Sequence, residues 1–256
     1  MKYIIDLDGT LLSGETANLD SVAFMKHLNA TNTDYLVMTN SIKSPTKIQE
    51  KLEKVGIAVE TRQIMNPINA INCYLKTMAF KNAFVVGSQS EIDQVEVAVN
   101  NENPDIIILL DFEKENVCYD KLQEVFKLIN KGTPVITASK SNYYLKNGER
   151  VLDTGAFTSL LEAAGEITIE VFGKPSTEYF KSGLSLLNAS PIDVMVIGDD
   201  WKTDIKGAMS VGCKSALLKS GKYADGDELH VPEARCLDCL MAIFNKENSK
   251  ILSNNI

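Results

Sequence analysis

Apolar runs of strand length alternate with segments of helical spacing along almost the whole chain. The runs are Tyr3–Ile5, Tyr35–Met38, Phe84–Val86, Ile106–Leu110, Val135–Ile136, Ile169–Phe172, Val194–Ile197 and Ser215–Leu218. Apolar residues spaced as in a helix lie between them, over Leu19–Leu28, Gln89–Asn100 and Leu122–Ile129. Parallel sheets with helices on both faces are built in this way. The pattern therefore predicts an α/β fold with a doubly wound, Rossmann-like parallel sheet.

One predicted helix has clear boundaries in the sequence. Ser44 is a good N-cap, and Pro45 suits the first helical position because its missing N–H would have no partner there. Gly56 suits the end of the same helix. We therefore predict a helix that starts at Pro45 and stops before Gly56.

Polar, reactive residues follow four of the apolar runs. They stand in Asp6-Leu7-Asp8-Gly9-Thr10, in Thr39-Asn40-Ser41, in Gly173-Lys174-Pro175, and in Gly198-Asp199-Asp200 with Thr203-Asp204 just after it. Ligands of doubly wound sheets bind beyond the carboxyl ends of the strands. If the four strands are neighbours, the side chains that meet in one crevice are Asp6, Asp8, Thr39, Lys174 and Asp199.

The residue types in this predicted crevice suit a metal ion beside a phosphate. Asp6 and Asp8 repel each other, and a divalent cation compensates for that repulsion. Asp199, with Asp200 or Asp204, would add oxygen ligands, and such an oxygen-only set suits Mg²⁺. Each aspartate alone is more simply explained as a turn residue or helix cap. Their occurrence at four strand ends in this order favours the site.

A lysine and a threonine supply the groups that would hold a phosphate. Lys174 offers a point charge for one phosphate oxygen, and Thr39 offers a hydroxyl for another. Lys174 taken alone would be read as an ordinary surface lysine. Its position after a predicted strand makes it part of the crevice.

The net charge limits the kinds of partner to expect, and the N-terminus and the cysteines indicate a cellular compartment. The 256-residue chain has a net charge of −8, which repels nucleic acid and anionic lipid. We expect neither nucleic acid nor a membrane as partner. The N-terminus lacks the pattern of a signal peptide, and the five cysteines are scattered. These features predict a cytoplasmic location.

The strand-end residues resemble the motifs of the haloacid dehalogenase (HAD) superfamily. The first motif is matched by Asp6-Leu7-Asp8-Gly9-Thr10, the second by Thr39-Asn40, the third by Lys174, and the fourth by Gly198-Asp199-Asp200 through Asp204. Asp153-Thr154-Gly155-Ala156 and the long insert between motifs two and three resemble the NagD-like, p-nitrophenyl-phosphatase-like branch. Ser41 and the run Thr137-Ala138-Ser139-Lys140 depart from that branch, so substrate identity does not carry over.

The resemblance implies a HAD core with a smaller α/β cap domain inserted in it. We expect the core at residues 1–68 and 172–256 and the cap at residues 69–171. Because caps of this branch often make dimer contacts, a homodimer is also expected. Residues of the cap would select the substrate, and we place Tyr143 at the leaving group. Tyr143 as an ordinary cap aromatic is the alternative.

The resemblance also implies an Mg²⁺-dependent phosphatase. Asp6 would be the nucleophile that forms an aspartyl-phosphate, and Asp8 the general acid and base. Asp6, Asp8 and Asp199 would hold the metal, with Asp200 and Asp204 orienting its shell. Thr39, Asn40, Ser41 and Lys174 would bind the phosphate. The substrate would be a small phosphate ester, such as a nucleotide, a sugar phosphate or pyridoxal phosphate.

Several rival functions remain open at this point. A phosphotransferase of the same fold would use the same residues, and so would a non-catalytic phosphate-ester binding protein descended from the enzyme. A dehalogenase needs the nucleophile but no acid such as Asp8. A phosphorylatable receiver domain also carries acids, threonine and lysine at strand ends, but it is about half this length and has no large insert.

Overall fold

The computed structural model describes residues 1–112, 118–146 and 149–245 of the chain. Within these residues the chain packs as two compact units. The first unit contains Met1–Thr39, Pro45–Met65 and the described residues from Lys174 onward, and the second contains Asn40–Ser44 and Asn66–Gly173. The domain boundaries expected from the sequence, 1–68 with 172–256 and 69–171, differ by a few residues from this division and stay a prediction. Each unit has its own parallel sheet with helices, so the predicted α/β class is confirmed.

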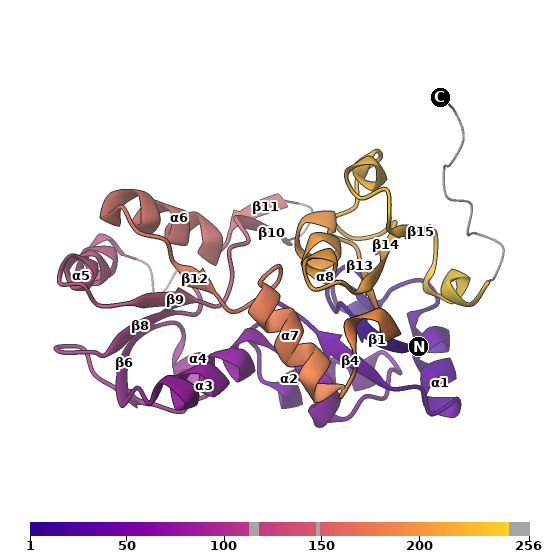
Figure 1. The fold of residues 1–256 in the computed structure, drawn as a ribbon, viewed down its shortest axis with the longest axis horizontal. Helices are drawn as coiled ribbons and strands as arrows, with labels where there is room; N and C mark the ends of the chain where they lie inside the picture. Colours follow the sequence, from indigo (N-terminus) through magenta and orange to yellow (C-terminus); the bar gives the residue numbers. More distant parts are fainter. Residues whose placement is uncertain (113–117, 147–148, 246–256) are drawn as a thin grey trace. The chain divides into compact units, whose positions relative to one another are not determined.

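The sheet of the first unit has the strand order β15-β14-β13-β1-β4-β5, and all its neighbouring strands are parallel (Figure 1). Its strands are β1 (Lys2–Ile5), β4 (Tyr35–Met38), β5 (Ile64–Met65), β13 (Val194–Gly198), β14 (Lys214–Leu218) and β15 (Arg235–Leu237). A small antiparallel hairpin, β2 (Leu12–Ser13) and β3 (Thr16–Ala17), follows β1. This order places β1 between β13 and β4, where it is covered on both edges.

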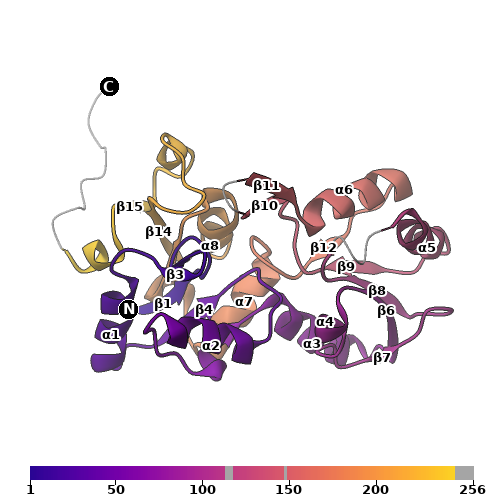
Figure 2. The ribbon, with the colours of Figure 1, turned by 180° about the vertical axis from the view of Figure 1, so that it is seen from behind.

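Helices cover both faces of this sheet because successive strand residues point to opposite sides. They are α1 (Ser21–Ala30), α2 (Pro45–Lys54), α7 (Thr177–Leu186) and α8 (Lys206–Ser210). Tyr3 and Ile5 pack in one core cluster with buried residues of α1 and α2, two helices that Figure 2 shows on the same side of the sheet. Ile4 points to the other face of the sheet, toward α7. The sheet packs closely against Gly183 of this helix: an added Cβ there would lie 3.5 Å from Cδ1 of Ile4. Short helical turns connect these elements at Thr61–Gln63, Pro191–Asp193, Trp201–Ile205, Asp227–His230 and Leu240–Phe244.

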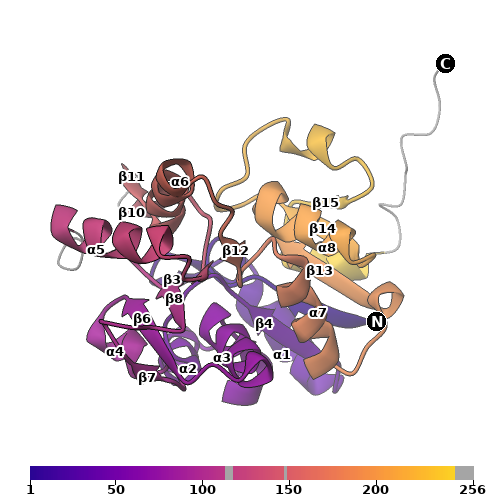
Figure 3. The same cartoon turned by 60° about the vertical axis from the view of Figure 1, so that its left-hand side comes forward.

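The second unit has a parallel sheet with the strand order β12-β9-β8-β6-β7. Its strands are β6 (Asn82–Val86), β7 (Ala98–Val99), β8 (Ile106–Leu109), β9 (Val135–Thr137) and β12 (Glu170–Val171). Figure 3 shows α5 (Tyr119–Asn130) and α6 (Thr154–Gly165) on one side of it and α3 (Pro67–Met78) and α4 (Gln89–Ile92) on the other. An antiparallel hairpin, β10 (Tyr143–Lys146) and β11 (Glu149–Leu152), precedes α6.

The structure confirms one predicted helix and corrects another. Helix α2 begins at Pro45 and ends before Gly56, which has the positive φ of a helix stop. The helix predicted over Gln89–Asn100 is wrong, because α4 ends at Ile92 and Ala98–Val99 forms β7 instead. The β-branched residues before Asn100 favour an extended chain, and pairing with β6 satisfies their backbone.

Tyr179 of α7 ties together two places where the chain leaves the first unit. Its buried hydroxyl lies 2.8 Å from the carbonyl oxygen of Thr39 and 3.0 Å from that of Met65. The Thr39 N–H also donates to the Met65 carbonyl. These contacts hold the ends of β4 and β5 at fixed positions and so fix the backbone of Thr39.

We expect Tyr179→Phe to lower the free energy of unfolding by about 1–2 kcal/mol, because it leaves buried carbonyl groups short of a donor. Chemical denaturation monitored by circular dichroism measures this change. Tyr35→Phe is the matched control, since its hydroxyl donates to the side chain of Asn29 at a less buried position. An unchanged unfolding midpoint for Tyr179→Phe would show that these hydrogen bonds do not stabilise the fold.

Candidate active site

Three of the predicted site residues follow neighbouring strands of the first unit. Asp6 follows β1, Thr39 follows β4 and Asp199 follows β13. Because Ile5 is in register with Val37 on one side and Ile197 on the other, these residues emerge at one edge of the sheet. All three are buried, with exposed fractions of 6% or less.

Three buried carboxylates and one buried ammonium group form the centre of the site. Carboxylate oxygens of Asp6, Asp199 and Asp204 lie within 4.8 Å of one another. Lys174 donates to Oδ1 of Asp6 and, at 2.6 Å, to Oδ1 of Asp204. The second oxygen of Asp6, Oδ2, is buried and has no hydrogen-bond partner among the residues that the structure describes. These side chains together carry two more negative than positive charges when all are ionised.

The pKa values of these groups report the same imbalance. Burial raises the pKa of Asp199 well above its ordinary value, and the charges of Asp6 and Asp204 raise it further. Burial also raises the pKa of Asp204, to about 7, although the Lys174 charge opposes this shift. Burial alone would lower the pKa of Lys174, but the carboxylates of Asp204 and Asp6 raise it above its ordinary value. The cluster therefore binds positive charge, either as protons or as a cation.

Asp199 is fixed by donors on both oxygens and by two glycines. Thr10 donates its hydroxyl to Oδ1 at 3.0 Å, and the Lys222 N–H donates to Oδ2 at 2.7 Å. A Cβ atom on Gly9 would lie 2.2 Å from Oδ2 of Asp199, and one on Gly221 would lie 2.1 Å from it. Both glycines also have positive φ. The carboxylate therefore lies between two backbone segments that only glycine lets approach so closely.

Asp8 has a different environment from Asp6. Its side chain is 53% exposed, whereas that of Asp6 is 8% exposed. The Nζ atom of Lys51, on α2, lies 3.3 Å from Oδ1 of Asp8. Asp8 is thus outside the buried carboxylate cluster, although it is only two residues from Asp6.

The remaining predicted residues divide between the two units. Asp200 accepts hydrogen bonds from the N–H of Lys202 and the Nζ of Lys222, while its own N–H donates to Asp204. Asn40, Ser41 and Tyr143 belong to the second unit, where the Tyr143 ring lies under the guanidinium of Arg150. The roles assigned to all these residues stay predictions.

Sequence reasoning missed the residues that fix Asp199 from the loop after β14. The Ser220 hydroxyl donates to the Gly9 carbonyl, and the Lys222 N–H donates to Asp199. Gly221, three residues after the end of β14, is the signal that the sequence offers for this loop. Lys51 was missed as well, because nothing in the pattern of α2 connects it with Asp8.

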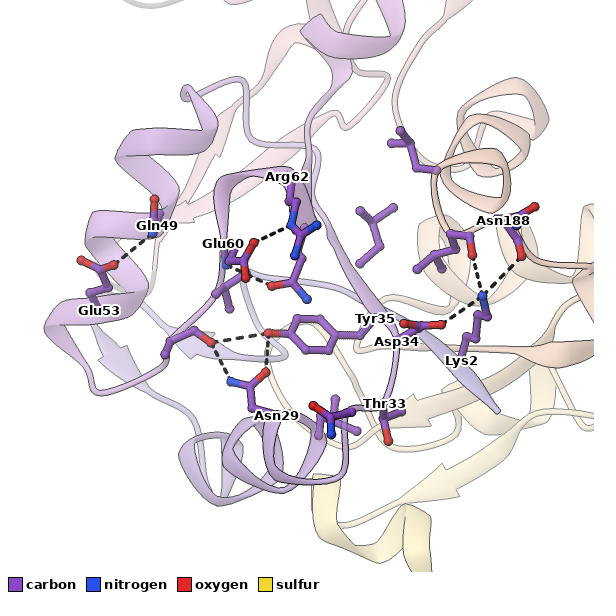
Figure 4. A pocket seen from close by; sticks show the side chains of 18 residues that line it. Lys2, Asn29, Thr33, Asp34, Tyr35, Gln49, Glu53, Glu60, Arg62 and Asn188 are labelled. Atoms are coloured by element: carbon purple, nitrogen blue, oxygen red, sulfur yellow. Dashed lines mark hydrogen bonds and ion pairs between the residues drawn. The ribbon is translucent and has the colours of Figure 1, made fainter.

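A hollow of about 880 Å³ lies at the opposite edge of the same sheet, where β1 and β4 begin (Figure 4). Its charged groups include Lys2, which pairs with Asp34 at 3.0 Å, and Arg62, which pairs with Glu60 at 2.5 Å. Both of these cations are already neutralised by neighbouring carboxylates. The buried carboxylates Asp6, Asp199 and Asp204 lie at the carboxyl edge instead.

None of the helices that the structure describes is long and apolar enough to cross a membrane.

Comparison with known proteins places the chain in a family. Residues 3–98 match the family described as haloacid dehalogenase-like hydrolase, and residues 171–240 match a second, HAD-hydrolase-like family. The chain is 30% identical over 241 residues to the human phospholysine phosphohistidine inorganic pyrophosphate phosphatase, covering 91% of this chain and 87% of the relative. It is 27% identical over 237 residues to the mouse haloacid dehalogenase-like hydrolase domain-containing protein 2, covering 92% and 90%.

Solved structures share the fold. NagD from E. coli K-12 superposes with a TM-score of 0.85 at 19% identity, covering 93% of this chain and 96% of that one. The p-nitrophenyl phosphatase from Archaeoglobus fulgidus superposes with a TM-score of 0.86 at 18% identity, covering 94% and 97%. The chain thus has the fold of NagD and of this p-nitrophenyl phosphatase, as the resemblance to the NagD-like branch implied. The chain belongs to the haloacid dehalogenase-like hydrolase family and is a phosphatase of that family.

Proposed function

We propose that this phosphatase hydrolyses a small-molecule phosphate monoester, with Mg²⁺ as its cofactor and Asp6 as the nucleophile. One observation carries the proposal: Oδ2 of Asp6 is buried without a donor from the described part of the chain, and Asp6 lies in a cluster with Asp199 and Asp204. A buried carboxylate oxygen without a partner costs stability unless a bound group supplies one. The phosphate and its counter-ion are such groups.

The residues at the site fit Mg²⁺. Their ligand atoms are oxygens, and the two uncompensated negative charges equal the charge of one divalent cation. Asp6, Asp199 and the main-chain carbonyl of Asp8 would hold it. When bound, the cation would reduce the repulsion between the Asp6 carboxylate and an incoming phosphate dianion. Asp204 and Asp200 orient this set through their bonds to Lys174 and to each other.

In the proposed reaction Asp6 attacks the phosphorus in line with the ester oxygen. The new bond joins an Asp6 oxygen to phosphorus, and the bond from phosphorus to the alcohol oxygen breaks. Asp8 gives its proton to the departing oxygen. Asp8 then takes a proton from the water that attacks the aspartyl-phosphate, which restores both aspartates and releases inorganic phosphate.

The other predicted residues bind and position the phosphoryl group in this proposal. Lys174, beside Asp6, and the hydroxyl of Thr39 hold its oxygens, because phosphoryl transfer depends mainly on positioning and on charge stabilisation. Asn40 and Ser41 are further proposed phosphate contacts, and Tyr143 is a proposed contact of the leaving group. The cytoplasmic location and the homodimer also belong to the proposal.

The substrate class remains a small phosphate-bearing molecule. Nucleotides, sugar phosphates and pyridoxal phosphate are the classes expected from the sequence. The name of the human relative adds phospholysine, phosphohistidine and inorganic pyrophosphate. The first two have P–N rather than P–O bonds, so testing them beside esters shows which type of bond the site cleaves.

We expect Mg²⁺-dependent release of inorganic phosphate from at least one of these classes, and from p-nitrophenyl phosphate as a general probe. Asp6→Asn should abolish turnover and keep the fold, because an amide is a poor nucleophile and nearly the same shape. Phosphate release and circular dichroism measure the two effects. Turnover by Asp6→Asn near the wild-type rate would refute the assignment of Asp6 as the nucleophile.

Mg²⁺ should raise the melting temperature of the wild-type protein, and more strongly at about pH 8 than at about pH 5. Protons on Asp204, whose folded pKa is about 7, and on Asp199 compete with the cation. The raised pKa of Asp204 also means that its contribution to metal-free stability falls as the pH rises toward 7. Differential scanning fluorimetry across this range measures both effects.

Asp199→Asn should abolish the Mg²⁺-induced rise and leave the metal-free protein at least as stable at pH above about 7, because it removes one repelling carboxylate. Asp225→Asn, at an exposed position, is the control that should keep the Mg²⁺ response. A full Mg²⁺ response in Asp199→Asn would mean that the cation binds elsewhere.

Gly221→Ala should reduce Mg²⁺-dependent activity at least about 100-fold, because its Cβ would displace the Asp199 carboxylate. Gly14→Ala is the matched control: Gly14 has φ +63 against +54 for Gly221, and no atom lies within 4 Å of its added Cβ. Both variants carry the same kind of backbone strain, so the difference between them measures the crowding alone. Equal losses in steady-state assays would contradict this role of Gly221.

A further inference from the structure

We propose that Lys51 is a positioning residue that holds the Asp8 carboxyl group in the orientation needed for proton transfer to the leaving group. The inference rests on the proposed role of Asp8 as general acid and base. It adds a residue of α2, outside the four sequence motifs, to the machinery of the reaction. The contact that carries it joins Nζ of Lys51 to Oδ1 of Asp8 at 3.3 Å.

The Asp8 carboxyl group needs a partner to fix its orientation. Its main chain is held, since Asp8 bridges to Leu12 and the N–H of Gly9 donates to the Leu12 carbonyl at 2.7 Å. Its side chain is half exposed, so packing does not choose its rotamer. Among the described residues, Lys51 is the donor that contacts it.

Helix α2 gives Lys51 a fixed starting point. Ile48 and Leu52 of the same helix are almost fully buried and pack in one cluster with Leu7 and Leu11, on either side of Asp8 in the sequence. The Lys51 side chain is only 19% exposed, so its aliphatic part is largely covered while its charged end reaches Asp8. The ammonium group is therefore better defined in position than that of a typical surface lysine.

A second carboxylate, Glu15, is a weaker partner for the same ammonium group. Its Oε1 lies 3.8 Å from the Nζ of Lys51, and its side chain is 86% exposed. Exposed ion pairs at such distances contribute little. The shorter contact, with Asp8, is therefore the one that sets the position of the Lys51 ammonium group.

The contact also distinguishes the two oxygens of Asp8. Oδ1 accepts from Lys51, which leaves Oδ2 to carry the transferable proton. In the first step the proton on Oδ2 goes to the departing alcohol oxygen as its bond to phosphorus breaks. In the second step Oδ2 takes a proton from the attacking water, and Lys51 keeps its own protons throughout.

Phenyl phosphate and p-nitrophenyl phosphate test this role, because they are similar in size and differ in how much the leaving group needs a proton. Phenol is a much weaker acid than 4-nitrophenol, so the departure of phenoxide depends on Asp8 far more strongly. The quantity to compare is kcat/KM, since it reports the steps up to release of the leaving group. A purely structural defect lowers kcat/KM for both substrates by the same factor.

We expect Lys51→Met to lower kcat/KM for phenyl phosphate about tenfold and for p-nitrophenyl phosphate less than about threefold. Lys51→Arg should restore the value for phenyl phosphate to within about threefold of wild type, because it keeps a donor with a positive charge. Lys54→Met removes an exposed lysine of the same helix and should change neither value. Melting temperatures establish that the variants are folded, with Lys51→Gln as the replacement if Lys51→Met is unstable.

Asp8→Asn separates a failure of this inference from a failure of the proposed function. It should lower kcat/KM for phenyl phosphate at least about 100-fold, with a smaller loss for p-nitrophenyl phosphate. In the Asp8→Asn background, Lys51→Met should add no further substrate-dependent loss. Equal losses for both substrates in Asp8→Asn would overturn the proposed role of Asp8. A selective Asp8→Asn together with an unselective Lys51→Met, or additive losses in the double variant, would overturn the role of Lys51 alone.

Discussion

The structure depends on a buried group of carboxylates that the protein's own cations only partly neutralise. Asp6, Asp199 and Asp204 are removed from water, and each such transfer costs several kcal/mol unless the charge is compensated. Lys174 compensates one of the three by bridging Asp6 and Asp204. Burial raises the pKa values of Asp199 and Asp204, and the charge of Asp6 raises them further, so Lys174 balances only part of the charge of this group. A group of carboxylates with this imbalance is suited to bind a cation, for which protons compete.

The parallel sheet explains how the group is assembled from distant parts of the chain. Neighbouring strands β13, β1 and β4 end at one edge, and each delivers one residue there. The sheet alone does not set the fine geometry of Asp199. That geometry comes from Gly9 and Gly221, whose backbones close on the carboxylate from two sides, and from the donors Thr10 and Lys222. The sheet brings the residues together, and the loops with glycines decide their exact contacts.

Sequence patterns predicted those features of the fold that depend on neighbouring residues in the chain. Apolar runs predicted the strands, and the acids after them predicted that Asp6 and Asp199 follow neighbouring strands. The prediction of a helix over Gln89–Asn100 was wrong because Ala98–Val99 pairs with β6 as a strand, and this pairing outweighs a weak helical pattern. The contact of Lys222 with Asp199 could not be predicted, because the position of a loop after β14 is set by tertiary packing rather than by its own residues.

Asp6 and Asp8 show how two identical side chains in one motif acquire different environments, which suit the different roles proposed for them. Strand β1 ends at Ile5, so the chain turns between the two aspartates. Asp6 stays in the buried cluster, where its position relative to Lys174 is fixed, as in-line attack on phosphorus requires. Asp8 reaches the more exposed side, where it can exchange protons with a leaving group or with water. In its proposed role as proton carrier, Asp8 lacks the packing that orients Asp6. An ammonium group on a well-packed helix, such as that of Lys51, can supply this orientation without closing the site to water.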